Sequence, residues 1–283
     1  MSELLFRAGL LEGKVALITG GGSGIGLQTA HDFAALGAEV WIASRKKKRI
    51  EEAAAGLSEL LGTVVHPLVC DIRDRENITQ VVETICTHSG KIDVLVNNGG
   101  GQFLSPAEHI RDKGWDSVIA TNLTGTWNMT KAVAQASMFK NGGHILNITM
   151  TTGRGYPGMA HSVAARSGVE AMTKTLAVEW AKYGVKINCI QPGIIASSGM
   201  NNYPNGLMLA HSMQKEIPAK RLGSCAEVSQ LLTFLASPGG DYVTGQVWTI
   251  DGGSSLWSKS WPIPDPKPLP EVVIKTWPWE NED

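Results

Sequence analysis

Cysteine is scarce in this sequence of 283 residues, and its cysteines are not arranged for metal binding. Cys70, Cys86, Cys189 and Cys225 stand far apart, and no two of them form a C-x-x-C pair. Such pairs are the usual sign of a zinc site, and regular cysteine spacings are the sign of a disulfide scaffold. We therefore expect no metal site and no disulfide framework. Scattered single cysteines suit the reducing cytoplasm.

The sequence also lacks long apolar runs and an excess of one charge. No stretch of about 18 apolar residues exists, although a membrane span needs one. Residues 1–13 contain Glu3, Arg7 and Glu12, which interrupt any apolar leader. The formal net charge of −1 excludes a basic protein that coats nucleic acid. We predict a cytoplasmic protein with neither a membrane nor a nucleic-acid partner.

Seven short apolar runs recur along the chain, separated by segments long enough for helices. The runs occupy residues 15–18, 40–43, 64–69, 94–96, 145–148, 187–190 and 247–250. Residues 25–36 and 163–183 carry apolar side chains at helical spacing. Strands buried on both faces of a parallel sheet read as continuous apolar runs. The sequence therefore predicts an α/β fold with a Rossmann-type, doubly wound, seven-stranded parallel sheet in a single domain.

The composition changes near residue 254. Residues 254–283 contain six of the thirteen prolines and four of the nine tryptophans. The alternating prolines between 262 and 270 exclude a helix, and exposed indole rings are unfavourable in water. We therefore divide the chain into a folded domain at residues 1–253 and a tail at 254–283. The tail is expected to pack along the domain or onto a neighbouring subunit.

A glycine-rich turn follows the first predicted strand and opens the first predicted helix. Its sequence is Thr19-Gly20-Gly21-Gly22-Ser23-Gly24-Ile25-Gly26. Glycines at such a turn let backbone N–H groups and the helix N-terminus approach a pyrophosphate. Between a strand and an amphipathic helix, the turn indicates a dinucleotide site. The residues assigned to it are Gly20, Ser23, Gly24, Ile25 and Gly26.

The end of the second predicted strand carries basic residues and no acid. In a dinucleotide site an acid there binds the ribose 2′-hydroxyl, whereas a basic residue accommodates a 2′-phosphate. Here the sequence reads Ser44-Arg45-Lys46, and the Arg45 guanidinium is suited to a phosphate. We therefore predict NADP(H) as the cofactor, with NAD(H) less favoured. Residues 47–49 are expected to be the solvated start of a helix.

Two further strand ends are expected at the same crevice, because open α/β sheets bind ligands outside the carboxyl ends of their strands. Asp71 and Ile72 follow the third predicted strand, and Asn97-Asn98-Gly99-Gly100 ends the fourth. The Asp71 carboxylate is assigned to the adenine amine. Asn97 and Gly99 are also assigned to the cofactor.

These motifs together resemble the short-chain dehydrogenase/reductase family over about residues 13–253. Besides the glycine-rich turn and Asn97-Asn98-Gly99-Gly100, the resemblance rests on Thr121-Asn122 and Pro192-Gly193. Residues 97–109, 161–166 and 217–221 are more closely similar to peroxisomal trans-2-enoyl-CoA reductases and 2,4-dienoyl-CoA reductases. A weaker similarity links the chain to bacterial terpenoid alcohol dehydrogenases. The resemblance implies an NAD(P)-dependent oxidoreductase of fatty acid metabolism that forms a homodimer or homotetramer.

The chain departs from the family at its catalytic signature, a tyrosine followed by three residues and a lysine. Alignment places Arg166 at the lysine position and Ser162 at the tyrosine position. Arg166 can keep the contact with the nicotinamide ribose, but it does not lose a proton near neutral pH. The Ser162 hydroxyl is far too weak an acid to replace the phenol.

Four other residues are candidates for the reaction. Asn122, by resemblance, holds a water chain near the basic residue. Thr149 and Thr151 lie near the family's serine position, where they either donate to the substrate oxygen or are ordinary strand-end threonines. Tyr156 either supplies a displaced phenol or packs beside Pro157.

The loop after the sixth predicted strand resembles the family's segment that binds the nicotinamide carboxamide. Its assigned residues are Pro192, Gly193 and Ile195. Residues 196–214 are interpreted as a lid over the substrate. Met200, Met208 and Met213 would give that lid an adaptable apolar lining.

The missing phenol favours reduction of a carbon–carbon double bond. Reduction of a ketone needs a proton on oxygen, whereas hydride addition to an enoyl thioester makes an enolate that hydrogen bonds can stabilise. We therefore predict an NADPH-dependent enoyl-CoA reductase. One alternative is an NADP-dependent alcohol dehydrogenase or ketone reductase for an apolar, terpenoid alcohol, with Tyr156 as its acid. Another is a dinucleotide-binding protein without activity.

Overall fold

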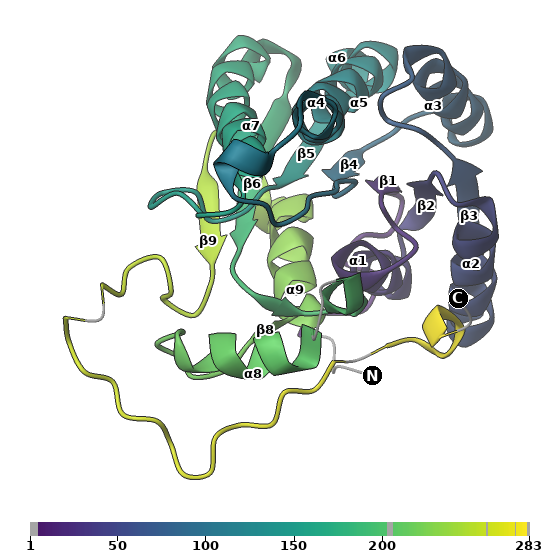
Figure 1. The fold of residues 1–283 in the computed structure, drawn as a ribbon. Helices are drawn as coiled ribbons and strands as arrows, with labels where there is room; N and C mark the ends of the chain where they lie inside the picture. Colours follow the sequence, from purple (N-terminus) through teal and green to yellow (C-terminus); the bar gives the residue numbers. More distant parts are fainter. Residues whose placement is uncertain (1–4, 203–205, 259, 275, 282–283) are drawn as a thin grey trace.

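A seven-stranded parallel sheet forms the centre of the computed structural model, which describes residues 5–202, 206–258, 260–274 and 276–281 (Figure 1). Its strand order is β3-β2-β1-β4-β5-β6-β9. Each predicted apolar run forms one of these strands, so the predicted fold class is confirmed. The strands are β1 Val15–Thr19, β2 Glu39–Ser44, β3 Val65–Val69, β4 Val94–Asn97, β5 Gly143–Ile148, β6 Val185–Pro192 and β9 Val247–Ile250.

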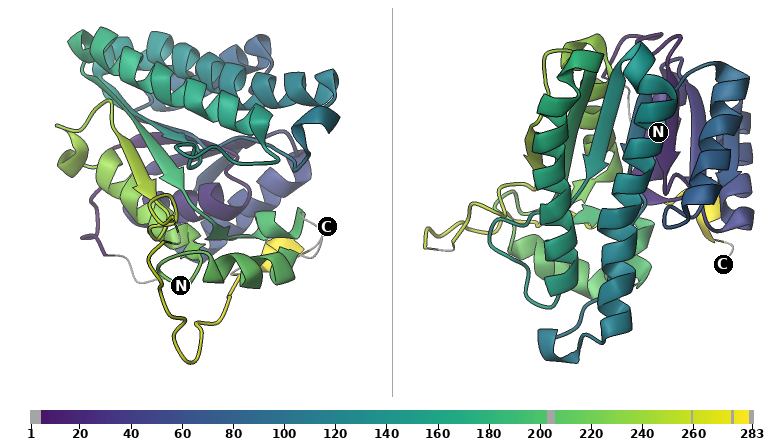
Figure 2. Two further views of the ribbon diagram at one scale, coloured as in Figure 1. Left: turned by 60° about the vertical axis from the view of Figure 1, so that its left-hand side comes forward. Right: turned by 90° about the horizontal axis from the view of Figure 1, so that it is seen from above.

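Helices cover both faces of the sheet (Figure 2). One face carries α1 (Gly24–Ala35), α2 (Lys47–Leu61) and α9 (Cys225–Ala236). The other carries α3 (Arg75–Ser89), α5 (Thr126–Val133) and α7 (Ala160–Glu179). None of the described helices is both long and apolar enough to cross a membrane. The shorter helices are α4 (Asp112–Ile119), α6 (Phe139–Asn141) and α8 (Gly206–Lys215), and π-helical turns at Ala120–Gly125 and Ala134–Met138 flank α5.

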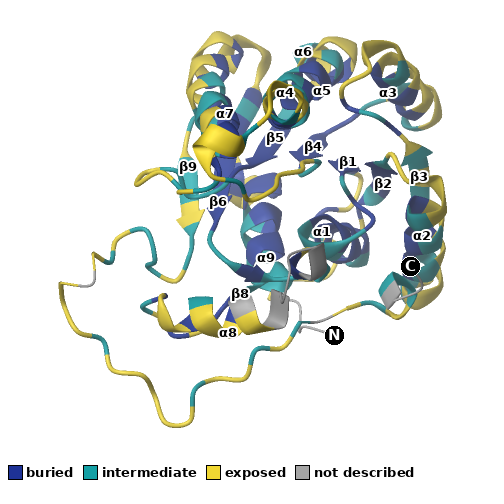
Figure 3. Cartoon of the chain, in the orientation of Figure 1, coloured by how far each residue is buried: buried dark blue, intermediate teal, exposed yellow. Residues whose placement is uncertain are grey.

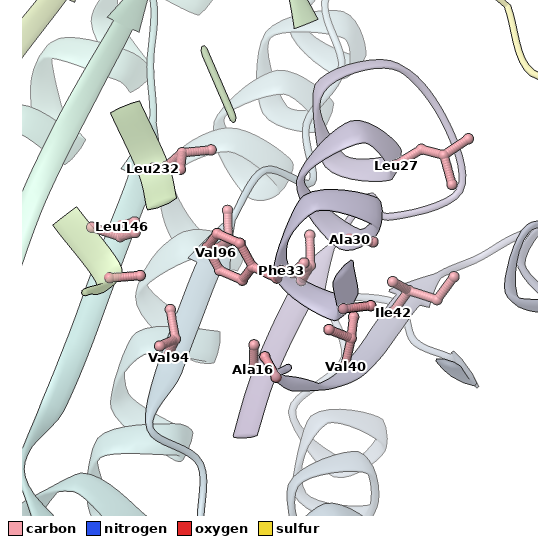
Figure 4. Packing of buried hydrophobic residues seen from close by; sticks show 14 of the residues in the cluster. Ala16, Leu27, Ala30, Phe33, Val40, Ile42, Val94, Val96, Leu146 and Leu232 are labelled. Atoms are coloured by element: carbon pink, nitrogen blue, oxygen red, sulfur yellow. The ribbon is translucent and has the colours of Figure 1, made fainter. Parts of the chain in front are cut away.

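Phe33 of α1 lies at the centre of the larger apolar core (Figure 4). Its ring is fully buried, and Val96 of β4 and Leu232 of α9 belong to the same cluster. Truncation of such a phenylalanine to alanine typically costs about 3–5 kcal/mol of stability. This core holds α1 against the sheet and thereby fixes the turn that precedes the helix.

The tail after β9 extends from the domain in a long loop, and most of it is exposed (Figure 3). Its end returns to the body, where Trp277 and Trp279 pack against the larger core and stack on each other with centroids 5.4 Å apart. A Cβ atom on Gly56 of α2 would clash with the Trp279 ring. The expected packing along the domain is therefore confirmed for these two indoles, whereas Trp261 is exposed.

Candidate functional site

Three adjoining cavities open at the carboxyl ends of the central strands. We call them the outer cleft, the inner cleft and the apolar cavity. The outer cleft, of about 210 Å³, is lined by the ends of β1, β2 and β3. The inner cleft follows the ends of β4 and β5 and shares Gly100 with the outer cleft. The apolar cavity, of about 340 Å³, shares Gln102, Met150 and Gly193 with the inner cleft.

The glycine-rich turn gives the outer cleft a backbone surface. Gly20 and Gly24 adopt left-handed φ angles of 66° and 54°, which glycine reaches without strain. A Cβ on Gly26 would lie 2.5 Å from Asn98 Nδ2 and closer still to Gly20 O. The Ser23 side chain makes no capping bond to α1 and lines the cleft. This cradle fits a pyrophosphate at the helix N-terminus.

The basic residues after β2 are divided between the cleft and the solvent. Arg45 and Lys46, which the sequence assigns to a 2′-phosphate, line the outer cleft beside Ser44. Arg49 also lines it, although the sequence analysis assigned Arg49 to the solvated helix. Arg49 lies in the first turn of α2, directly after this strand end. Lys47 and Lys48 instead form exposed ion pairs with the following turn of α2.

Asp71 lines the outer cleft with Ile72 and Gly99 but already has a partner. Its carboxylate accepts two hydrogen bonds from Arg73 Nε, at 2.9 and 3.2 Å, and a third from Arg73 Nη2. The bonds with Arg73 lower the pKa of Asp71. An ionised Asp71 remains able to accept from an adenine amine.

Arg166 is a buried cation at the wall of the inner cleft. Its side chain comes from the first half of α7 and is 7% exposed. Nη1 donates to Ile148 O at 2.8 Å, and no described carboxylate pairs with the guanidinium. Burial lowers the pKa of Arg166 to about 10, so the group stays charged near neutrality. A buried charge is costly unless its N–H groups find hydrogen-bond acceptors. The N–H groups of Arg166 that do not bond to Ile148 O fit the hydroxyl oxygens of a bound ribose.

Asn122 and Asn97 have roles in the scaffold. The Asn122 side chain is fully buried, where Nδ2 donates to Gly101 O at 2.9 Å and Oδ1 accepts from Gly101 N at 3.0 Å. It holds the loop after β4, whereas the sequence analysis assigned it to a water chain. Asn97 Nδ2 donates to Thr130 Oγ1 of α5 and to Asn147 Oδ1 of β5. Its neighbour Asn98 lines the inner cleft, and its Nδ2 donates to Thr19 O and Gly20 O at the start of the glycine-rich turn.

Ser162 occupies the place of the phenol but does not face the reaction space. It is fully buried, and its hydroxyl donates to Gln102 Oε1 at 2.7 Å. Its bonding partners Gln102 and Met150 line both the inner cleft and the apolar cavity, whereas Ser162 lines neither. Ser162 therefore orients Gln102.

The apolar cavity holds one phenol. Tyr156 lines it, and it is the sole titratable side chain among the described lining residues. Thr151 lines the same cavity, whereas Thr149 lines the inner cleft and its hydroxyl donates to Ile190 O at 3.2 Å. The apolar part of the wall comprises Leu104, Met150, Met159, Pro192, Ile194, Ile195, Met200 and Met213.

The segment interpreted as a lid contributes to this wall. It forms a short strand β7 (Ile195–Ala196), a turn at Ser198–Asn202 and α8. Met200 and Met213 face the cavity as expected, but Met208 is 72% exposed and is not part of the lining. Pro192, Gly193 and Ile195 line both the inner cleft and the cavity, next to the expected nicotinamide position.

A carboxylate of the tail, which the sequence did not predict as a site residue, lies beside the glycine-rich turn. Glu280 Oε1 accepts from Gly24 N at 3.4 Å and from Ser198 Oγ at 2.8 Å. No local pattern points to this contact, because 256 positions separate Glu280 from Gly24. Gln102 was also missed as a site residue, although its place after the glycines that follow β4 is a usable signal.

Comparison with known proteins agrees with this architecture. A family model described as Enoyl-(Acyl carrier protein) reductase matches residues 20–255. The peroxisomal 2,4-dienoyl-CoA reductase of Danio rerio is 35% identical over 256 residues, which cover 90% of this chain and 85% of that protein. The 3-oxoacyl-(acyl-carrier-protein) reductase FabG of Thermotoga maritima is 38% identical over 244 residues, with coverages of 86% and 98%.

A solved structure gives the same result. The citronellol catabolism dehydrogenase AtuB of Pseudomonas aeruginosa is 42% identical to this chain and superposes with a TM-score of 0.80. The match covers 89% of this chain and 98% of that one. With the doubly wound sheet and the glycine-rich turn in place, these similarities show that the chain belongs to the short-chain dehydrogenase/reductase family of oxidoreductases.

Proposed function

We propose that this chain reduces the carbon–carbon double bond of an enoyl-CoA thioester with NADPH. The observation that carries the proposal is the state of Ser162, which stands where the family has its phenol. Its hydroxyl is buried and bonded to Gln102, so no acidic hydroxyl serves a substrate oxygen from that position. Ketone reduction depends on such an acid. Reduction of a conjugated thioester needs only hydrogen bonds to an enolate oxygen. The similarity to 2,4-dienoyl-CoA reductases also supports reduction of a carbon–carbon double bond.

The residues of the two clefts fit a nicotinamide dinucleotide. When bound, NADPH would supply the hydride. The glycine-rich turn would hold its pyrophosphate, and Arg166 would hold the nicotinamide ribose. Arg45 and Arg49, which both line the outer cleft, would bind the 2′-phosphate and favour NADPH over NADH.

The substrate would lie in the apolar cavity. The methionines of its wall accept an acyl chain without a fixed shape, because thioether side chains adapt their packing. The Tyr156 and Thr151 hydroxyls, which line the same cavity, would donate to the enolate oxygen. Water would then protonate the α carbon. The acyl-CoA substrate, the homodimer or homotetramer and the cytoplasmic location stay predictions.

A second candidate function rests on Tyr156. Since its phenol lines the apolar cavity, it supplies the acid that an alcohol dehydrogenase or ketone reductase requires. The similarity to the citronellol catabolism dehydrogenase supports an apolar alcohol as substrate. In this case Tyr156→Phe would abolish ketone reduction, a loss of about 10²- to 10⁴-fold in kcat.

Steady-state oxidation of NADPH separates the two functions. The purified chain would be offered a medium-chain trans-2-enoyl-CoA, the matching 2,4-dienoyl-CoA, and a ketone of the same chain length. We expect oxidation with a thioester and none with the ketone. Ser162→Ala should keep thioester reduction within a few-fold, because this hydroxyl only orients Gln102. Oxidation with the ketone alone would overturn the proposal.

A further inference from the structure

A separate group of metal-binding side chains lies at the edge of the sheet opposite the clefts. Glu39 opens β2, His66 is the second residue of β3, and His88 lies in the last turn of α3. One possible ligand atom from each lies within 4.8 Å of the other two. We propose that these three side chains bind a zinc ion, with water as the fourth ligand.

The fold itself brings the three residues together. His66 pairs in register with Trp41, so both side chains lie on the same face of the parallel sheet. Glu39 precedes Trp41 by two positions and shares that face. Helix α3 packs over this face through Ile78, Val81 and Ile85, and its last turn places His88 beside His66. No sequence motif marks the group, because three separate elements contribute it.

Neighbouring side chains hold the carboxylate in place. Glu39 Oε1 accepts a hydrogen bond from Trp41 Nε1 at 2.8 Å and another from Ser89 Oγ. Within the described part of the chain, no hydrogen bond or ion pair uses the second oxygen. Outer partners of this kind orient a metal ligand and are a regular part of metal sites.

The two imidazoles are also oriented and available. The His66 ring stacks on Trp41, with centroids 4.2 Å apart and an interplanar angle of 16°. His88 makes edge contacts with both rings, at 5.3 Å to Trp41 and 5.2 Å to His66. Among the described residues, none forms a hydrogen bond with the ring nitrogens of either histidine. The nitrogens are therefore free to bind a cation.

The ligand atoms favour zinc over magnesium and calcium, and the position of the three residues indicates a structural role for the ion. Two imidazoles and one carboxylate suit zinc, whereas magnesium and calcium prefer oxygen ligands alone. The length of β2 separates Glu39 from Ser44 at the outer cleft by about 17 Å. The ion would therefore not take part in hydride transfer. Since β3 is the edge strand of the sheet, the ion would tie that edge to β2 and α3.

Isothermal titration of the full, tag-free chain with ZnCl₂ tests the proposal. We expect one equivalent to bind, with at least a tenfold loss of affinity in His66→Asn and in His88→Asn. His109→Asn is the matched control, because His109 is exposed and lies outside the group. Titration with MgCl₂ should show no binding. The far-UV circular dichroism spectrum should be equal in every variant, which shows that each is folded and keeps this test independent of the proposed function.

Thermal unfolding supplies a second measurement. Zinc should raise the Tm of the unchanged chain, because the ion binds the folded state and its ligands come together only there. The His66→Asn/His88→Asn double variant should show no such rise. Absence of saturable zinc binding, or equal binding by the double variant, would overturn the proposal, and the latter result would point to the cysteines.

Discussion

Replacement of Arg45 by alanine is expected to weaken NADPH binding and to leave NADH binding unchanged. The exposed Arg45 side chain lines the outer cleft, so its truncation disturbs no core packing. A hydrogen bond to a charged group contributes about 1.5–3 kcal/mol, and exposure to solvent reduces this to about 1–2 kcal/mol. The dissociation constant for NADPH should therefore rise about 5- to 30-fold, as measured by isothermal titration.

Lys48→Ala is the matched control for this loss of charge. Lys48 lies three positions further along, is 69% exposed, and forms an ion pair with Glu52 at 3.6 Å. We expect it to change NADPH affinity by less than about twofold, because a surface pair of this kind contributes little. Equal weakening of NADPH and NADH in Arg45→Ala, or no weakening of either, would refute the assignment of Arg45 to the 2′-phosphate.

Four further changes test other parts of the account. Gly26→Ala should abolish cofactor binding, since its Cβ would clash with Gly20 O. Retained NADPH binding in an isothermal titration would contradict the assignment of the glycine-rich turn to the pyrophosphate. Tyr156→Phe should lower kcat for thioester reduction only about tenfold, the effect of one lost hydrogen bond; complete loss would favour the phenol as an obligatory acid. Glu280→Gln should lower the dissociation constant for NADPH about 2- to 5-fold, because a carboxylate no longer competes with the pyrophosphate for the N-terminus of α1. A higher dissociation constant would refute this competition between Glu280 and the cofactor. Arg221 holds the pKa of Glu227 at about 2, so the pair should stabilise the fold above about pH 4.3 and lose its effect as the pH falls towards 2. Urea unfolding should then give Glu227→Gln a lower free energy of unfolding than the unchanged chain at pH 7, and the difference should shrink at low pH. A difference that does not change with pH would contradict this role of the ion pair.

The sheet could be predicted from the sequence because buried parallel strands leave a local record. Each strand is a short apolar run, and the glycine-rich turn lies directly after the first of them. The outer cleft was predictable for the same reason, since strand ends in this topology meet at one edge. Ser44, Arg45, Asp71 and Gly99 all line it.

Roles that depend on side-chain direction or on distant segments could not be predicted. Asn97 and Asn98 are adjacent, yet the Asn97 amide donates to Thr130 and Asn147, whereas the Asn98 amide donates to Thr19 O and Gly20 O. Asn122 bonds to Gly101 across 21 positions, and Glu280 reaches Gly24 from the tail. Such contacts are set by tertiary packing, which has no local pattern.

The most direct test of the central claim follows the transferred hydrogen. The chain would be incubated with NADPH that carries deuterium at both C4 positions of the nicotinamide, together with a medium-chain trans-2-enoyl-CoA, and the product would be examined by mass spectrometry and NMR. The account predicts a saturated acyl-CoA with one deuterium on the β carbon and the α-carbon proton taken from water. Unchanged thioester, together with deuterium transfer to the carbonyl carbon of a matched ketone, would contradict it.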